Sequence, residues 1–187
     1  ADLMTLRVLT AAALAAFVAL PVAAQVQKQD VAGIRNYSRV DASVGCGGAT
    51  EPAAMAALKR EGYVSVINLR LASEEGADVE AGRAAAQSAG LTYIHLPFSG
   101  GSPDPKIVDG FLAAVADPGN QPVYIHCASA NRVGAVWMIK RVLQDGWPIE
   151  KARTEAEAIS RLHEAFVATL ADKWAIEQVA THEAFVV

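Results

Sequence analysis

The sequence predicts an α/β domain with a central, mostly parallel sheet flanked by helices, followed by a helical C-terminal extension. Short apolar segments rich in β-branched residues alternate along the chain with segments of helical composition. Such alternation favours crossover connections and a sheet that is covered on both faces. Of the 187 residues, 52% are hydrophobic and 19% are charged, which excludes intrinsic disorder as the main state.

The first half of the domain begins with a candidate strand at 39–44, which a glycine-rich turn ends. A helix is expected over 50–60, because Thr50 is a suitable N-cap and a proline follows it in the first turn. The β-branched run 63–69 is typical of a buried strand. Residues 75–89 have helical composition and end at a glycine, which is a common helix stop.

The second half repeats this alternation. A strand is expected at 91–96, followed by a loop rich in Gly, Ser and Pro at 99–105. Residues 106–116 place apolar side chains on one helical face. The apolar run 122–126 predicts a further strand, and a helix is expected over 132–144.

These signals divide the chain into four parts. Residues 4–24 have the pattern of a secretory signal peptide, with a basic start, an apolar core and small residues before Gln25. The apolar run is short for a membrane span, although an uncleaved anchor is the alternative. We expect a linker or extended arm at 25–37, the main domain at 38–148 and a helical extension at 149–187 that packs on it.

The composition of the chain argues against several classes of protein. A net charge of −4 and a pI of about 5.6 argue against a nucleic-acid binder. Two cysteines exclude a disulfide-dense scaffold, and no histidine or cysteine spacing indicates a metal, so we expect no cofactor. The signal pattern predicts export to the periplasm or beyond, without stable membrane insertion after cleavage. The oligomeric state stays open.

One segment, 123–134, carries the candidate chemistry. A buried strand delivers Cys127 into a short loop that closes with Arg132 at the start of a helix. The backbone amides of such a loop and the helix N-terminus favour an anion, and a guanidinium fits a tetrahedral oxyanion. The same groups favour a cysteine thiolate. We therefore expect Cys127 as the nucleophile and Arg132 as the clamp, with a phosphorylated substrate or small oxyanion held by the amides of Ala128, Ser129, Ala130, Asn131 and Arg132.

The loop 124–134 resembles the signature loop of cysteine-based phosphatases, and most closely that of the bacterial beta-lactamase-hydrolase-like, protein phosphatase-like branch of the dual-specificity phosphatases. Residues 47–50 are similar to that branch's Gly-Gly-Gln-Pro turn, 66–70 to its Val-Ile-Asn-Leu-Arg strand and 93–97 to its central strand. The resemblance spans about 40–143. It implies a dual-specificity phosphatase fold and hydrolysis of phosphomonoesters through a cysteinyl-phosphate.

Several residues depart from that pattern. Only four residues separate Cys127 from Arg132, where typical tyrosine and dual-specificity phosphatases have five; the shorter loop occurs in this bacterial branch and also in rhodanese sulfurtransferases. Ala130 replaces the usual glycine, which costs about 1 kcal/mol if φ is positive there. Val133 replaces the usual hydroxyl residue after the arginine, a role that Ser129 could partly fill. A persulfide-carrying sulfurtransferase and a non-catalytic oxyanion-binding module therefore remain alternatives.

The general acid is not fixed by the sequence. Asp104 lies in the loop after the central strand and is the best candidate, although an aspartate between two prolines also fits an N-cap. Glu74 and Glu75 are the next candidates. Without an acid, catalysis would favour substrates with good leaving groups.

Two further residues have expected supporting roles. Cys46 is placed in the turn after the first strand, either as a redox partner for Cys127 or simply as a buried thiol. His126 is expected to orient the loop through hydrogen bonds rather than to act as an acid.

Overall fold

The computed structural model describes residues 25–97, 99 and 104–160. Its elements in chain order are β1 (Gln27–Lys28), β2 (Ser38–Arg39), β3 (Val44–Gly47), a 3₁₀ turn (Pro52–Ala54) that leads into α1 (Met55–Arg60), β4 (Ser65–Asn68), α2 (Val79–Ser88), β5 (Thr92–His95), α3 (Pro105–Ala116), a second 3₁₀ turn (Pro118–Asn120), β6 (Val123–His126), α4 (Asn131–Leu143) and α5 (Ile149–Ile159). The predicted α/β class is confirmed.

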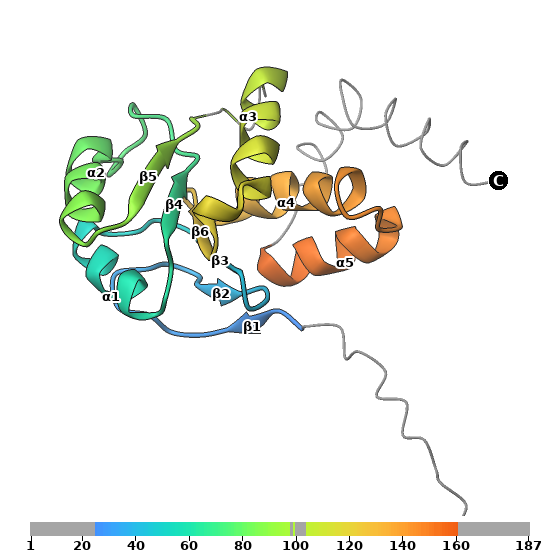
Figure 1. Ribbon diagram of the computed structural model, residues 1–187, viewed down its shortest axis with the longest axis horizontal. Helices are drawn as coiled ribbons and strands as arrows, with labels where there is room; N and C mark the ends of the chain where they lie inside the picture. Colours follow the sequence, from blue (N-terminus) through green and yellow to red (C-terminus); the bar gives the residue numbers. More distant parts are fainter. Residues whose placement is uncertain (1–24, 98, 100–103, 161–187) are drawn as a thin grey trace, which may run out of the picture.

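Within the described residues, six strands form one sheet in the order β1-β2-β3-β6-β4-β5 (Figure 1). The neighbouring strands β3, β6, β4 and β5 are parallel, whereas β1 and β2 pair antiparallel at one edge. At the end of β6, His126 is in register with Gly47 of β3 and with Asn68 of β4. The loops after these three strands therefore start at the same level, where parallel sheets bind ligands.

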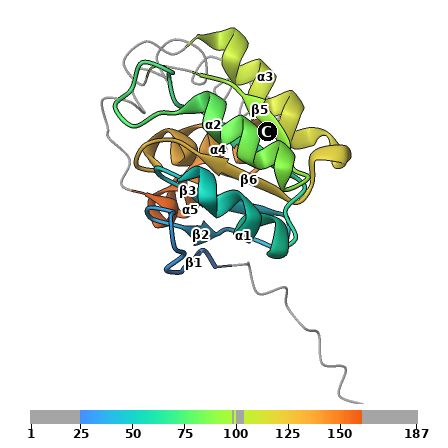
Figure 2. The same ribbon diagram turned by 90° about the vertical axis from the view of Figure 1, so that its left-hand side faces the viewer.

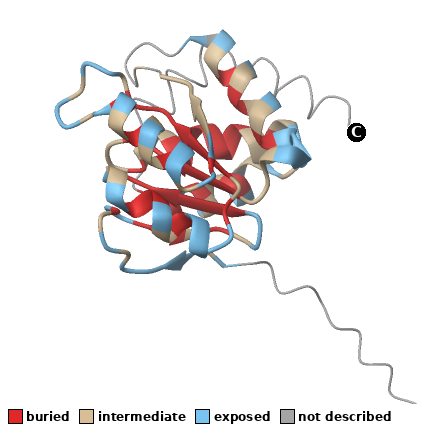
Figure 3. Cartoon of the chain, turned by 60° about the vertical axis from the view of Figure 1, so that its left-hand side comes forward, coloured by how far each residue is buried: buried red, intermediate tan, exposed pale blue. Residues whose placement is uncertain are grey.

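Helices cover both faces of this sheet: α1 and α2 lie on one side, and α3, α4 and α5 on the other (Figures 1 and 2). Because side chains alternate along a strand, each face has its own buried cluster. Ile67 and Ile125 pack with Phe111, Val133 and Trp137 on the α3–α4 side. On the α1–α2 side the cluster contains Met55, Leu58, Val66, Ala86 and Tyr124. Figure 3 shows these buried residues concentrated in the strands and the inner helix faces.

The first predicted strand, 39–44, is wrong in its position. The chain instead forms a hairpin, with β2 ending at Arg39 and β3 beginning at Val44. Asp41 makes the turn, because its carboxylate accepts hydrogen bonds from the N–H and the hydroxyl of Ser43, both at 2.8 Å. Cys46 is therefore inside β3 rather than in the turn after a strand.

The arm at 25–37 is part of the folded unit. Gln27 pairs with Arg39 and Lys28 with Ser38, so the arm adds the edge strand β1. Two of its side chains, Ile34 and Tyr37, are buried in the α1–α2 cluster. The predicted signal segment, 4–24, lies outside the described residues.

Helix α5, at the start of the predicted C-terminal extension, packs on the domain. Helix α5 lies along α4 (Figure 1), with Ala152 and Ala156 buried against it. The indole N–H of Trp137 donates to Glu155 at 2.8 Å, and Arg141 pairs with the same carboxylate at 2.7 Å. Residues 161–187 lie outside the described part of the chain. Among the described helices, none has the length and apolar character needed to cross a membrane.

Candidate active site

The nucleophile predicted from the sequence lies between β6 and α4. All four residues of β6 are buried, and the chain leaves the sheet at Cys127, whose side chain is 1% exposed. The N–H of Cys127 donates to the Gly47 carbonyl at 3.2 Å. Its side chain belongs to the same cluster as Ile125, on the α3–α4 side of the sheet. The predicted strand–cysteine–loop–helix arrangement is therefore present.

Two carbonyl groups of the loop are held from outside it. The Ala128 carbonyl accepts from the Ala49 N–H at 2.9 Å. The Ser129 carbonyl accepts from the side-chain amide of Asn36 at 3.2 Å and from the Ser160 hydroxyl at 3.3 Å. Because a trans peptide is planar, its N–H points opposite to its C=O. The N–H groups of Ser129 and Ala130 therefore point away from these supports, as an anion cradle requires.

The loop departs from relaxed backbone geometry at Ala130. This residue has φ of +75°, in the left-handed region, and caps the N-terminus of α4. A side chain there costs about 1 kcal/mol relative to glycine. The strain expected from the alanine-for-glycine replacement is confirmed, and the loop keeps its turn despite it.

Gly48 has a specific reason to be glycine. A Cβ at this position would lie 2.9 Å from the Ala128 carbonyl oxygen and 3.2 Å from the Cα of Ser129. These are backbone atoms that cannot move aside without displacing the cysteine loop. The glycine-rich turn after β3 therefore packs directly against that loop.

Arg132 is half-buried and its terminal nitrogens are held by a carboxylate. Its Nη1 and Nη2 donate to the two oxygens of Glu74 at 2.6 and 2.8 Å, and Nη1 also donates to the Leu69 carbonyl at 3.1 Å. Burial by itself disfavours the charge, but the bonds to Glu74 and the adjacent Cys127 raise the pKa of the guanidinium. Arg132 is thus a fixed cation next to Cys127.

The role of Glu74 was missed by sequence reasoning, which offered it as a general acid. Burial alone would raise its pKa, yet hydrogen bonds from Arg132 and from the Leu71 N–H lower it. Arg70 adds a further contact at 3.3 Å. A carboxylate held in this way is ionised near neutral pH and donates no proton, so Glu74 positions Arg132 instead. The partner of an arginine in another loop has no local sequence signal.

Asp104 is the N-cap of α3. Its carboxylate is exposed and accepts from the Lys106 N–H at 2.9 Å. The N-cap alternative is therefore confirmed, and a role as general acid stays a prediction. Residues 100–103, which precede it, lie outside the described residues.

His126 faces the opposite side of the sheet from Cys127. Its ring stacks on Tyr124, with centroids 5.9 Å apart and planes 14° apart. Burial lowers the pKa of His126 to about 3, and the nearby backbone of Cys127 and Gly48 offsets this only in part. Neither ring nitrogen has a hydrogen-bond partner of good geometry among the described residues. The expected orienting hydrogen bonds are thus not found there, and the ring is neutral at physiological pH.

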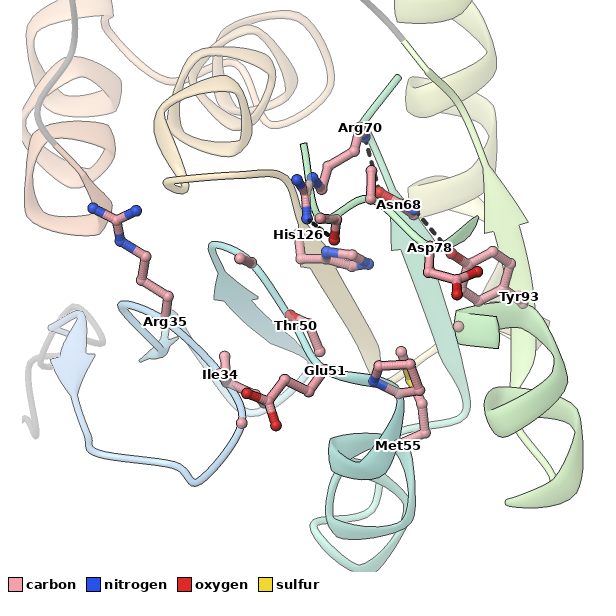
Figure 4. Close-up of a pocket in the computed structure, with 16 residues that line it drawn as sticks. Ile34, Arg35, Thr50, Glu51, Met55, Asn68, Arg70, Asp78, Tyr93 and His126 are labelled. Carbon is pink, nitrogen blue, oxygen red and sulfur yellow. Dashed lines mark hydrogen bonds between the residues drawn. The ribbon is translucent and has the colours of Figure 1, made fainter. Parts of the chain in front are cut away.

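A pocket of about 420 Å³ lies on the His126 side (Figure 4). The N-terminal arm, the turn after β3, the loop after β4 and the start of α2 form its walls. Its labelled lining residues are Ile34, Arg35, Thr50, Glu51, Met55, Asn68, Arg70, Asp78, Tyr93 and His126. The lining includes no residue from 127–132, so this hollow adjoins the cysteine loop without containing it.

Cys46 is fully buried, and both cysteines are free thiols. Burial raises the pKa of the Cys46 thiol, and the nearby Glu155, Asp41 and Cys127 add to this shift. A thiol in this state is a poor nucleophile. A redox role with Cys127 stays a prediction. Within the described ranges, no group of three His, Cys, Asp or Glu side chains is arranged to hold a metal.

The mostly parallel sheet thus presents a Cys-x4-Arg loop between its strand β6 and the helix α4. Residues 36–144 match the family described as "Beta-lactamase hydrolase-like protein, phosphatase-like domain", and the chain belongs to this family. The resemblance noted from the sequence is confirmed.

Two curated relatives match part of this chain. Beta-lactamase hydrolase-like proteins from two Xylella fastidiosa strains, Temecula1 and 9a5c, are each 36% identical over 108 residues. The match covers 56% of this chain and 23% of each relative. The chain thus corresponds to about a quarter of the length of these proteins.

Solved structures with low identity share the fold. A DUF442 protein from Shewanella putrefaciens CN-32 is 22% identical, with a TM-score of 0.64 over 76% of this chain and 95% of that one. TpbA from P. aeruginosa, solved in complex with pTyr, is 17% identical, with a TM-score of 0.64 over 88% and 99%. The catalytic core of the PP-IP phosphatase Siw14 from S. cerevisiae, in complex with citrate, is 19% identical, with a TM-score of 0.62 over 84% and 98%.

Proposed function

We propose that this protein is a cysteine-dependent phosphatase that hydrolyses phosphomonoesters through a cysteinyl-phosphate. The observation that carries the proposal is the loop from Cys127 to Arg132. Two of its carbonyls are held outward, and its arginine is held as a cation by Glu74. Such a loop offers amide donors and a fixed positive charge to a tetrahedral dianion next to a thiol.

The reaction would proceed in two displacements. The Cys127 thiolate attacks phosphorus, the bond from phosphorus to the ester oxygen breaks, and that oxygen leaves as an anion, which takes its proton from water. Water then attacks the cysteinyl-phosphate, the sulfur–phosphorus bond breaks, and inorganic phosphate leaves. The amides of 128–132 and Arg132 stabilise the charge that develops on the three equatorial oxygens in both steps.

Substrates with good leaving groups are the best first probes, because no proton donor is assigned at this site. The pTyr complex of TpbA supports an aryl phosphate as the substrate to try first. We propose p-nitrophenyl phosphate for the assay.

The test compares wild type with Cys127→Ser, using Cys46→Ser as the matched control. We expect Cys127→Ser to abolish release of p-nitrophenol. Cys46→Ser should keep most of the activity, because Cys46 lies within β3 and not in the loop from Cys127 to Arg132. Hydrolysis that survives Cys127→Ser would refute the mechanism. Thiocyanate formation from thiosulfate and cyanide, without ester hydrolysis, would instead identify a sulfurtransferase.

A further inference from the structure

We propose that Asn36 and Ser160 are positioning residues that hold the Ser129–Ala130 peptide of the cysteine loop with its carbonyl outward and its N–H toward the bound anion. The inference rests on the proposed function, because it concerns the same oxyanion cradle. It assigns part of the control of that cradle to the N-terminal arm and to the end of α5.

The contacts converge on one carbonyl from two distant parts of the chain. Asn36 Nδ2 lies 3.2 Å from the Ser129 oxygen and 3.4 Å from the Ile159 oxygen at the end of α5. Ser160 Oγ lies 3.3 Å from the same Ser129 oxygen and also bonds Asn131 Oδ1. Because a hydroxyl has a single proton, Ser160 serves one acceptor at a time. The Asn36 amide is therefore the more constant donor.

The orientation of the Asn36 amide is determined by its surroundings. Lys28 Nζ lies 2.7 Å from Asn36 Oδ1 and also donates to the Ile159 carbonyl. An ammonium group only donates, so the amide oxygen must face Lys28 and the NH₂ group must face the two carbonyls. Asn36 has φ of +53°, a conformation that asparagine tolerates better than most residues.

This support matters because the Ser129–Ala130 peptide is the part of the loop most prone to rotate. Ala130 occupies the left-handed region without the freedom of glycine. If the peptide turned over, its carbonyl dipole would replace its N–H at the anion. Donors outside the loop oppose that rotation, because turning the Ser129 carbonyl inward would break its hydrogen bonds to Asn36 and Ser160.

Most of the supporting groups lie outside the region shared with the family. The family match begins at Asn36 and ends at 144, whereas Lys28, Ile159 and Ser160 lie beyond it. The flanks of this chain therefore contribute to a site whose chemical groups all come from the shared domain.

The experiment measures phosphate binding in the full chain by calorimetry, with kcat and KM for p-nitrophenyl phosphate measured alongside. Asn36→Gly removes the donor and keeps the backbone conformation, and Ser160→Ala removes the hydroxyl. Ser160→Thr should restore binding. Thr154→Ala is the matched control, because it removes another hydroxyl–carbonyl bond of α5, at 2.9 Å to Glu150.

We expect Asn36→Gly and Ser160→Ala each to weaken phosphate binding by about 2- to 10-fold, the effect of one hydrogen bond, and to raise KM more than they lower kcat. Thr154→Ala should bind phosphate like wild type. If a folded Asn36→Gly/Ser160→Ala double variant binds phosphate as tightly as wild type, the positioning role is refuted.

The two proposals can fail separately. Phosphate binding in wild type that is weakened in the variants, without any hydrolysis, would retain the positioning role and refute the phosphatase. Hydrolysis by the wild type, together with unchanged phosphate binding in the variants, would retain the phosphatase and refute the positioning role. A wild type that neither binds phosphate nor hydrolyses p-nitrophenyl phosphate would overturn both.

Discussion

Cys127 and His126 are neighbours in the chain, yet they face opposite sides of the sheet and meet opposite surroundings. On the Cys127 side, Arg132 and Glu74 form a charged pair next to the thiol. On the His126 side, the imidazole stacks on an aromatic ring and is held neutral by burial. The comparison shows that alternation along one strand gives two consecutive residues different surroundings: Cys127 lies next to an ion pair, whereas His126 lies against an aromatic ring at the wall of the pocket.

Among the residues that surround Cys127, the largest effect is expected from replacing Arg132. Arg132→Lys keeps the charge but loses the planar fork that binds Glu74 and that we propose also binds the substrate oxyanion. We expect kcat/KM for p-nitrophenyl phosphate to fall about 100- to 1000-fold. If Arg132→Lys keeps activity within a few-fold of wild type, a positive charge at this position is sufficient and the planar guanidinium is not required.

Glu74→Gln tests the other half of the pair. Without its ionised partner Arg132 loses its fixed position, and we expect kcat/KM to fall about 10- to 100-fold. The pKa of Glu74 is lowered in the folded protein. Its stabilising contribution is therefore present above the unfolded-state pKa of about 4.3 and is lost as the pH falls through the folded value.

Urea unfolding of wild type and Glu74→Gln at several pH values between 6 and 3 measures this contribution. The stability of the variant should depend less on pH at the acid end. If the free energy of unfolding depends on pH equally in the two proteins, the ion pair between Glu74 and Arg132 does not contribute as we expect.

His126→Phe probes the neutral side. A folded-state pKa of about 3, against about 6.5 in the unfolded chain, means that this group binds its proton more tightly when unfolded. Its contribution is complete above pH 6.5 and is lost progressively as the pH falls toward 3. In this window the free energy of unfolding should fall with pH in the wild type more steeply than in the variant. We expect the two slopes to differ by about 1.4 kcal/mol per pH unit.

The smallest effect is expected at Ala130. Ala130→Gly relieves about 1 kcal/mol of left-handed strain but removes a fully buried methyl group worth about 0.8 kcal/mol. Thermal unfolding should therefore detect almost no change. Ser129→Gly, at a position without positive φ, should cost about 1 kcal/mol and serves as the contrast.

The sequence predicted the order of strands and helices well wherever one local signal dominates. The β-branched run that became β4 and the apolar run that became β6 were recognised, as were α3 and the cysteine-to-arginine loop. It misplaced β3, because the turn at Asp41 depends on hydrogen bonds that two polar residues make only when the hairpin forms.

The residue types and spacing alone determined the chemical groups of this site: a thiol, a guanidinium five positions later and a helix that begins between them. Only the tertiary structure decided which other residues position these groups through hydrogen bonds. Glu74 reaches Arg132 across 58 residues, and Asn36 reaches Ser129 across 93. Periodicity and capping report the conformation of a few consecutive residues, whereas such partners meet only after the sheet has brought their loops to one edge.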